Sequence, residues 1–348
     1  MNIKTVSIKG SKRKLLDDIL KLVQEVDGKN VLDGFSGSGI VSAYLRGHGY
    51  LVTANDKMVS ANLYSRVFLE GFNQKRVTAH IKHINALSGN NGWITKNYSG
   101  SVQRTIRGTK GKVESRPLGF TINNAMKLDI ARDYADTIKN KKDRNAVIFS
   151  IIMAMNKVFN GSTDQKSCLK VWSPSSLKDV VFEIPSLIAG SIGRTYSGNV
   201  LDLKKKDYDV VYLDPPYTHG VLYDACYHLD SSVASWKKPI LDTDYAIPRP
   251  KEVCFRKNKA LAGEFYSKAS AKSDFKKLLG MFKTKRIILS YSDAPRNVLS
   301  YDELVEICSG FGNLTVKDRS HKICSQSNSQ KKVSTNLKEF FFIIDLTN

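Results

Sequence analysis

Apolar positions recur along the chain at two spacings, and each spacing predicts a different kind of element. Between residues 12 and 26 they lie three and four apart, which predicts an amphipathic helix. Short apolar runs at 31–32 and 50–54 predict buried strands. A glycine-rich turn at 34–39 and a helical segment at 40–47 join these two strands, so we expect the chain to begin with a βαβ unit.

The rest of the chain alternates between segments of different character. Gly, Ser, Thr and Asn are frequent from about residue 85 to 119, and basic residues there far outnumber acidic ones, which predicts an exposed basic loop region. Residues 123–159 predict a helical block, whose apolar part at 146–159 is too short to span a bilayer and is expected to be a core helix. Sheet-forming sequence resumes near Asn199 and continues into a strand at 209–213.

Further strands are expected near the C-terminal end, at 287–290, 314–316 and 340–344. The last two are expected to form an antiparallel hairpin with a long polar connection at 317–335. These elements predict an α/β domain formed by residues 1–84 and 186–348, with a largely helical and loop region at 85–185 inserted between its two parts.

Charge indicates the class of partner. The chain has 54 Lys and Arg residues against 33 Asp and Glu residues, a formal net charge of +21 that favours a polyanion such as nucleic acid. Two basic segments could make this contact, with candidate side chains Arg104, Arg107, Lys110, Lys112, Arg256 and Lys257. The five cysteines form no CxxC pair, so neither a zinc site nor a disulfide framework is expected. The first residues have no apolar leader core, and a cytoplasmic location with no membrane contact is therefore expected.

The sequence Asp214-Pro215-Pro216-Tyr217 directly follows the strand at 209–213. Open α/β sheets bind their ligands at the carboxyl ends of strands, so this is a candidate catalytic loop. The two prolines make it stiff. Asp214 supplies acceptor oxygens, the Pro215 carbonyl supplies another, and Tyr217 supplies a flat face. Together they can hold a planar base by its exocyclic amino group.

The turn that follows the first strand begins with an acid, Asp33, and continues with glycines. Glycines let a backbone approach a ligand closely. A carboxylate at this point suits an amino-bearing ligand such as S-adenosylmethionine better than a pyrophosphate, although a purely structural tight turn remains an alternative. Asp56, after the second strand, could bind ribose hydroxyls or cap the next helix. Lys12 could face a ligand carboxylate or simply begin the first helix.

Taken together, these segments resemble the D12 class of S-adenosylmethionine-dependent DNA N6-adenine methyltransferases. The resemblance is carried by residues 7–16, 32–39, 55–56 and 213–217, in this order, and it thins between about 85 and 199. It implies a Rossmann-like, seven-stranded mixed sheet, S-adenosylmethionine as methyl donor, and double-stranded DNA as substrate. It also implies that the insert at 85–185 recognises the target sequence, and a separately acting restriction endonuclease is one partner that it suggests.

The resemblance further implies roles for single residues. Asp214, Pro215, Pro216 and Tyr217 would be catalytic, with Asp214 and the Pro215 carbonyl accepting from N6 and Tyr217 stacking on the adenine. The cofactor would contact Lys12, Asp33, Phe35, Ser36, Gly37, Gly39, Asn55, Asp56, Asn199 and Asp202. The family often has Gly-Asp before the catalytic strand, whereas this chain has Gly198-Asn199. The contact to the adenine ring of the cofactor is therefore left open between Asn199 and Asp202.

The expected activity is site-specific methylation of a flipped-out adenine in duplex DNA, in restriction–modification or in phage or host DNA modification. N4-cytosine methylation is an alternative, although such enzymes more often have Ser where this chain has Asp214. Methylation of RNA at N6 of adenine and a non-catalytic DNA-binding role are further alternatives. No metal is expected.

Overall fold

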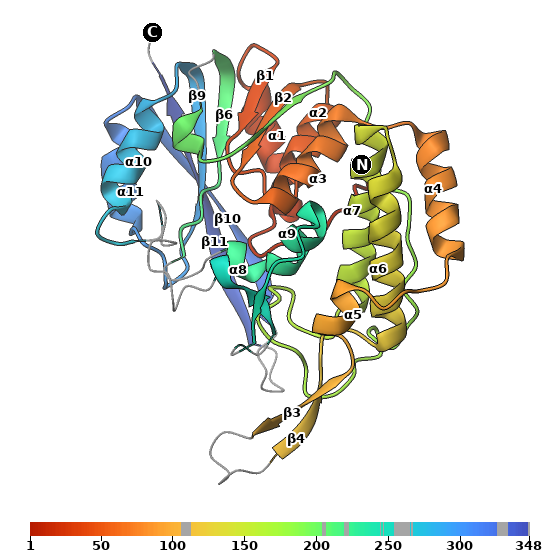
Figure 1. Cartoon of the computed structure of the whole chain (residues 1–348). Helices are drawn as coiled ribbons and strands as arrows, with labels where there is room; N and C mark the ends of the chain where they lie inside the picture. Colours follow the sequence, from red (N-terminus) through yellow and green to blue (C-terminus); the bar gives the residue numbers. More distant parts are fainter. Residues whose placement is uncertain are drawn as a thin grey trace.

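A seven-stranded sheet with helices on both faces forms the frame of the protein (Figure 1). The computed structural model describes residues 1–105, 113–203, 207–218, 223–243, 245, 247–253, 265, 267–325 and 333–346. From one edge of the sheet to the other, the strands are β10 (Asn313–Ser325), β11 (Val333–Asp345), β9 (Thr284–Ser292), β6 (Tyr208–Leu213), β1 (Asn30–Asp33), β2 (Leu51–Asp56) and β5 (Arg194–Ser197). The strands from β9 to β5 pair in parallel, and β11 is antiparallel to both of its neighbours. The expected α/β fold with a mixed sheet is confirmed.

Helices cover both faces of the central strands, and this explains why those strands are apolar throughout. Successive side chains of a strand point to opposite faces. In β6, Val210 and Tyr212 belong to one hydrophobic core, whereas Val211 and Leu213 belong to a second one on the other face. The first core is covered by α1 (Leu16–Gln24), α2 (Ile40–Gly47) and α3 (Val59–Glu70), and the second by α10 (Ala271–Gly280) and α11 (Tyr301–Ser309).

The strand order fixes where a ligand can bind. From β1 the chain continues through β2 to β5 on one side of the sheet, and β6 then begins the other side, which continues through β9. The connections therefore diverge at the carboxyl ends of β1 and β6, and such a switch point opens a crevice in α/β sheets. The glycine-rich turn follows β1 and the loop with two prolines follows β6, so both predicted motifs reach this crevice.

The N-terminal elements agree closely with the pattern of apolar positions. The predicted helix at 12–26 begins as a short 3₁₀ turn, η1 (Lys12–Leu15), and continues as α1. Helix α2 has the predicted bounds, and the glycine that precedes it, Gly39, has a φ of +72°. Residues other than glycine rarely adopt this backbone conformation, so a glycine at this position allows the turn to lead into α2 without strain.

The inserted region contains more regular structure than its composition predicts. Helix α4 (Gln74–Ala86) leads into it, and its elements are α5 (Trp93–Tyr98), β3 (Ser101–Thr105), β4 (Val113–Pro117), α6 (Ile122–Thr137) and α7 (Lys141–Val158). The helical block is confirmed, and α7 packs against α3 in the first core. The prediction of a loop at 85–119 is wrong where the chain forms α5 and the β3–β4 hairpin. Buried Asp129 on α6 accepts the backbone N–H groups of Ile94 and Thr95, so a distant carboxylate stabilises the start of α5.

The C-terminal hairpin is confirmed, but its strands are longer than predicted. Strands β10 and β11 pair from Asn313 with Asp345 as far as Ser325 with Val333, so much of the polar connection expected at 317–335 is strand. Strand β5 ends at Ser197, before the position where sheet structure was expected to resume.

The remaining elements are η2 (Val200–Asp202), α8 (Tyr223–Cys226), α9 (His228–Ser235), β7 (Leu241–Asp242), β8 (Arg249–Pro250) and η3 (Lys251–Val253). In the described part of the chain, no helix has both the length and the apolar character needed to cross a membrane.

Candidate active site

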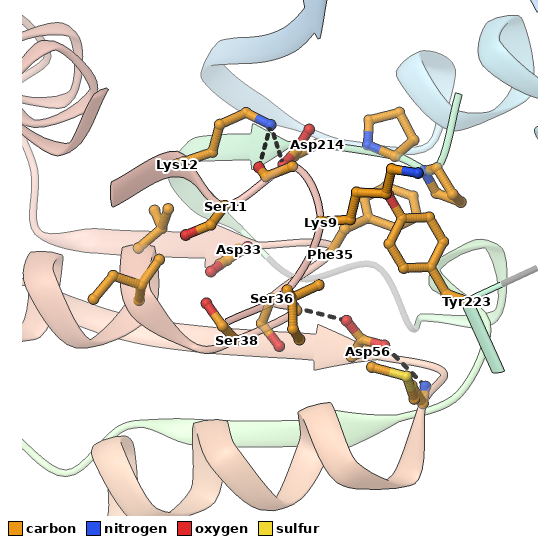
Figure 2. Close-up of a pocket in the computed structure, with 18 of the residues that line it drawn as sticks. Lys9, Ser11, Lys12, Asp33, Phe35, Ser36, Ser38, Asp56, Asp214 and Tyr223 are labelled. Atoms are coloured by element: carbon orange, nitrogen blue, oxygen red, sulfur yellow. Dashed lines mark hydrogen bonds and ion pairs between the residues drawn. The ribbon is translucent and has the colours of Figure 1, made fainter. Parts of the chain in front are cut away.

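A cavity of about 690 Å³ lies at the carboxyl ends of β1, β2 and β6 (Figure 2). It brings together most of the residues that the sequence singled out, although they come from widely separated segments. The predicted residues that line it are Lys12, Asp33, Phe35, Ser36, Gly37, Asn55, Asp56, Asn199, Asp214, Pro215, Pro216 and Tyr217. Gly39 and Asp202 are not among its lining residues: Gly39 packs against α3, and Asp202 lies in η2.

Asp33 ends β1 and is almost fully buried at the cavity. Its Oδ2 accepts a hydrogen bond of 2.6 Å from Ser42 Oγ, while its buried Oδ1 has no hydrogen-bond partner among the described residues. Burial raises the pKa of Asp33 to about 7, and the Ser42 hydrogen bond opposes this shift. A buried acceptor without a partner costs free energy, so Oδ1 is suited to receive a donor from a ligand.

Asp56 connects the end of β2 to the glycine-rich turn. Its Oδ2 accepts the N–H of Gly37 at 2.8 Å, and its Oδ1 accepts the N–H of Met58 at 2.9 Å, as Figure 2 shows. Gly37 has a φ of +49°, and no atom of the residues that the structure describes lies within 4 Å of the place where a Cβ would be, so the backbone is open to the cavity here. Burial raises the pKa of Asp56 to about 6. A carboxylate offers about four acceptor positions, so Asp56 can accept further hydrogen bonds from a ligand.

Asn55 and Phe35 complete this half of the cavity. Asn55 donates through Nδ2 to the backbone oxygens of Gly34 at 3.2 Å and Gly198 at 3.3 Å, which holds the two loops together. Its Oδ1 is buried and has no partner among the described residues. The ring of Phe35 meets the ring of Phe265 edge-on, with 5.7 Å between the ring centroids. This half therefore combines an apolar wall with buried acceptors.

Asp214 follows β6 directly and forms an ion pair with Lys12, 202 positions away in the sequence. Lys12 Nζ donates to Asp214 Oδ2 at 2.6 Å and to the Gly10 carbonyl oxygen at 3.1 Å. Burial raises the pKa of Asp214 to about 6, although the Lys12 charge opposes the shift. Burial is the largest single influence and acts to lower the pKa of Lys12, but Asp214 and the other acidic groups around it, Glu339 among them, together outweigh burial, so the pKa of Lys12 is well above its usual value. Lys12 is therefore a permanent cation beside the candidate catalytic loop.

Tyr217 is held in place by neighbours on one side of the cavity. Its ring lies against the ring of Tyr291 on β9, with 4.3 Å between centroids and 39° between the ring planes. Its carbonyl oxygen accepts the N–H of Val298 at 2.9 Å. Because packing and the stiff prolines fix this loop before any ligand arrives, little conformational entropy remains to be lost on binding.

The two candidates for contacting the ring system of a cofactor are separated by the structure. Asn199 lines the cavity and caps η2 by accepting the N–H of Leu201 at 3.1 Å. Asp202 lies at the end of the same short helix, away from the cavity lining. The geometry therefore favours Asn199 over Asp202.

Two further residues, Glu339 and Tyr223, also line the cavity, and of these Glu339 was not recognised from the sequence. Glu339 lies on β11, only 4% exposed, and its Oε1 is 3.4 Å from Lys12 Nζ. The only signal in the sequence is a charged residue directly before the apolar run 340–344. Tyr223 begins α8 on the opposite wall, and burial raises its pKa. Its phenol stays protonated and can serve as a hydrogen-bond donor.

The basic residues predicted to contact nucleic acid fall mostly outside the described residues. Arg107, Lys110, Lys112, Arg256 and Lys257 are in this group. Arg104 belongs to β3, in the hairpin that extends away from the body of the protein in Figure 1. Among the described residues, no group of three or more His, Cys, Asp or Glu side chains could hold a metal ion.

Comparison with known proteins agrees with this geometry. Residues 9–243 match the family of D12 class N6 adenine-specific DNA methyltransferases. Modification methylase LlaI of Lactococcus lactis subsp. lactis is 24% identical over 345 residues, covering 93% of this chain and 52% of that protein. Type II methyltransferase M.CviAII of Paramecium bursaria Chlorella virus 1 is 24% identical over 349 residues, covering 96% and 97%. The chain thus spans about half the length of some curated relatives, including LlaI, and nearly all of others.

Proposed function

The chain belongs to the D12 class N6 adenine-specific DNA methyltransferase family, and we propose that it transfers a methyl group from S-adenosylmethionine to N6 of a flipped-out adenine in duplex DNA. The observation that carries the proposal is the pair of aspartates Asp33 and Asp214. They follow neighbouring parallel strands at the switch point and line one cavity. Each meets the need of a different ligand.

The half of the cavity around the glycine-rich turn fits S-adenosylmethionine, which when bound supplies an electrophilic methyl group. Asp33 Oδ1, which is buried and has no hydrogen-bond partner in the described part of the chain, suits the α-amino group. Asp56 suits the ribose hydroxyls, because it ends the strand beside β1 and has acceptor capacity left. Phe35 and Asn199 are the candidates for the adenine ring of the cofactor, and the acids of this half disfavour a phosphate-bearing cofactor.

The half around Asp214 suits the target base. Asp214 and the Pro215 carbonyl can accept hydrogen bonds from the exocyclic amine, which directs the lone pair of N6 away from the protein acceptors. Stacking on Tyr217 would contribute roughly 1–3 kcal/mol, comparable to the few kcal/mol that base flipping costs. As positive charge develops on N6, the nearby Asp214 carboxylate would stabilise it. The main contribution of the protein is therefore positioning in a preformed site.

Incubation with methyl-labelled S-adenosylmethionine and duplex DNA, followed by nucleoside analysis, tests this function. We expect label in N6-methyladenine. Asp214→Asn should abolish transfer while S-adenosylmethionine still binds, and Asp202→Asn is the matched control because its carboxylate lies away from the cavity. Label in N4-methylcytosine, label in RNA only, or no transfer at all would instead support the alternative functions.

We also propose that residues 85–185 recognise the target sequence. The β3–β4 hairpin within this region extends from the body of the protein and carries Arg104, with further basic residues between its strands in the sequence (Figure 1). Phosphate contacts by such side chains position a protein on DNA, and a few contacts to base edges give it specificity. Replacing 101–117 with a short glycine-containing turn should weaken DNA binding and leave S-adenosylmethionine binding unchanged. Unaltered DNA affinity would contradict this role.

A role in restriction–modification, with a separately acting restriction endonuclease as partner, is supported by the relatives, which are modification methylases and type II methyltransferases. Sequencing of DNA from cells that produce the chain can test it. Methylation confined to one short sequence is the expected result, whereas N6-methyladenine without sequence preference would speak against the role.

A further inference from the structure

Glu339 is a buried carboxylate at the base of the proposed catalytic site. It lies on β11, paired in register with Ser292 of β9, and β11 is two strands away from β6 in the sheet. Its Oε1 accepts a hydrogen bond of 2.5 Å from Ser290 Oγ and lies 3.4 Å from Lys12 Nζ. Lys12 in turn donates to Asp214. A chain of one cation and two carboxylates therefore connects β11 to the catalytic loop.

Such an arrangement is unfavourable as a purely structural device. Removing a carboxylate from water costs several kcal/mol, and an ion pair in the interior often stabilises a fold no better than apolar residues of similar volume. After the half-buried Phe340, the positions of β11 from Phe341 to Ile344 are apolar and fully or nearly fully buried. An apolar residue at position 339 would continue this pattern without the cost of burying a charge. The acid at this point therefore indicates a role beyond packing.

We propose that Glu339 is a positioning residue of the methyl-transfer site: it holds the ammonium of Lys12 against Oδ2 of Asp214, so that Oδ1 is directed to the amine of the target base. This inference rests on the function proposed above and deepens it. Lys12 Nζ donates to the oxygens of Gly10 and Asp214, and it forms an ion pair with Glu339 Oε1 at 3.4 Å. Three anchors fix the ammonium in one place, and the ammonium in turn fixes the carboxylate.

The same geometry gives Glu339 an electrostatic effect on Asp214. Two like charges in one buried site oppose each other, and the Glu339 charge contributes to the raised pKa of Asp214 after burial, whereas Lys12 lowers it. Other groups act on this carboxylate from the surrounding elements. They are Asp33 at the end of β1, Tyr212 on β6, Tyr217 in the loop and Tyr223 on α8. Removing the charge of Glu339 should therefore make Asp214 a stronger acid.

The test compares Glu339→Gln with the wild-type protein by two independent measurements. The first is a carbon-13 NMR titration of selectively labelled aspartates, with the Asp214 signal assigned by its loss in Asp214→Asn. The second is the dependence of kcat on pH in the methyl-transfer assay. Glutamine keeps the shape of the side chain and an oxygen for Ser290, so a change reports mainly the charge. We expect the midpoint of Asp214 and the acidic limb of kcat to move about one unit to lower pH, the size typical of a nearby charge.

Two further variants complete the experiment: one should shift the pH profile in the opposite direction, and the other is a control. Lys12→Met should move the acidic limb to higher pH and lower the maximal kcat, because the carboxylate loses both its cation and its orientation. Glu306→Gln, at an exposed position on α11, should leave both measurements unchanged. If Glu339→Gln does not fold, Ser290→Ala takes its place, since loss of the Ser290 hydrogen bond frees the Glu339 carboxylate to turn away from the site and should shift Asp214 in the same direction.

The inference would be overturned by a midpoint of Asp214 that stays in place or moves to higher pH in the variant. A lower melting temperature with an unchanged pH profile would likewise mark Glu339 as merely structural. Failure of the proposed function has a different signature: the wild-type protein would transfer no methyl group to adenine, while the NMR titration would still show whether Glu339 and Asp214 are coupled.

Discussion

The orphaned oxygen of Asp33 makes a quantitative prediction for cofactor binding. In Asp33→Asn, the amide oxygen can keep the hydrogen bond that Ser42 donates at 2.6 Å, which leaves the NH₂ group at the position of Oδ1. That position then presents a donor to the α-amino group of S-adenosylmethionine. Loss of a hydrogen bond to a charged group costs about 1.5–3 kcal/mol, so we expect Kd to rise about 10- to 150-fold.

Isothermal titration calorimetry with S-adenosylmethionine measures this directly, with Asp202→Asn as the matched control that should bind like the wild-type protein. The pH dependence sharpens the test. Burial raises the pKa of Asp33 to about 7, and its ionised form attracts the ammonium, so wild-type affinity should increase as pH rises from 6 to 8. In Asp33→Asn this part of the increase should disappear.

Stability provides an independent check on the fold of the same variant. The folded-state pKa of Asp33 lies above the ordinary aspartate value of 3.8, so the folded protein binds this proton more readily than the unfolded chain does. The carboxylate therefore lowers wild-type stability progressively between pH 4 and pH 7, and the loss is complete above pH 7. Asp33→Asn should gain melting temperature relative to wild type over that range. A stable variant with a Kd within twofold of wild type would refute the assignment of Asp33 to the amino group.

Other residues give further predictions. Tyr217→Leu removes a stacking surface and should lower kcat/KM for duplex DNA about 5- to 150-fold, and equal activity would show that Tyr217 does not stack on the base. Asp230 accepts hydrogen bonds from three side chains in the core, so Asp230→Ala should lower the free energy of unfolding by about 1–3 kcal/mol; an unchanged urea midpoint would contradict this. Combined replacement of Arg107, Lys110 and Lys112 by Ala should reduce the slope of log K against log salt for DNA binding by about 3, and an unchanged slope would place the phosphate contacts elsewhere.

Several elements could be predicted because their signals are local. Helix α2 and strand β1 follow from apolar spacing and from the glycines between them. The hairpin of β10 and β11 was visible as two apolar runs. By contrast, the sequence of α5 has no strong helical signal of its own. Its first turn is stabilised by Asp129 on α6, which lies 35 residues after Ile94 and 34 residues after Thr95. A prediction of secondary structure from neighbouring residues cannot include a partner that is so distant in the sequence.

For the candidate site, local sequence patterns specify which chemical groups stand at the ends of the strands. These groups can be recognised from the sequence because each one fixes backbone conformation or chemistry within a few residues. They are the aspartates at the ends of β1 and β6, the glycines and the prolines. Which of these groups come into contact depends instead on the fold. Strand order brings Lys12 to Asp214 across 202 positions, and the register of β11 adds Glu339. These contacts depend on how the sheet is assembled, because a strand's local pattern specifies its buried faces but not the neighbour it pairs with.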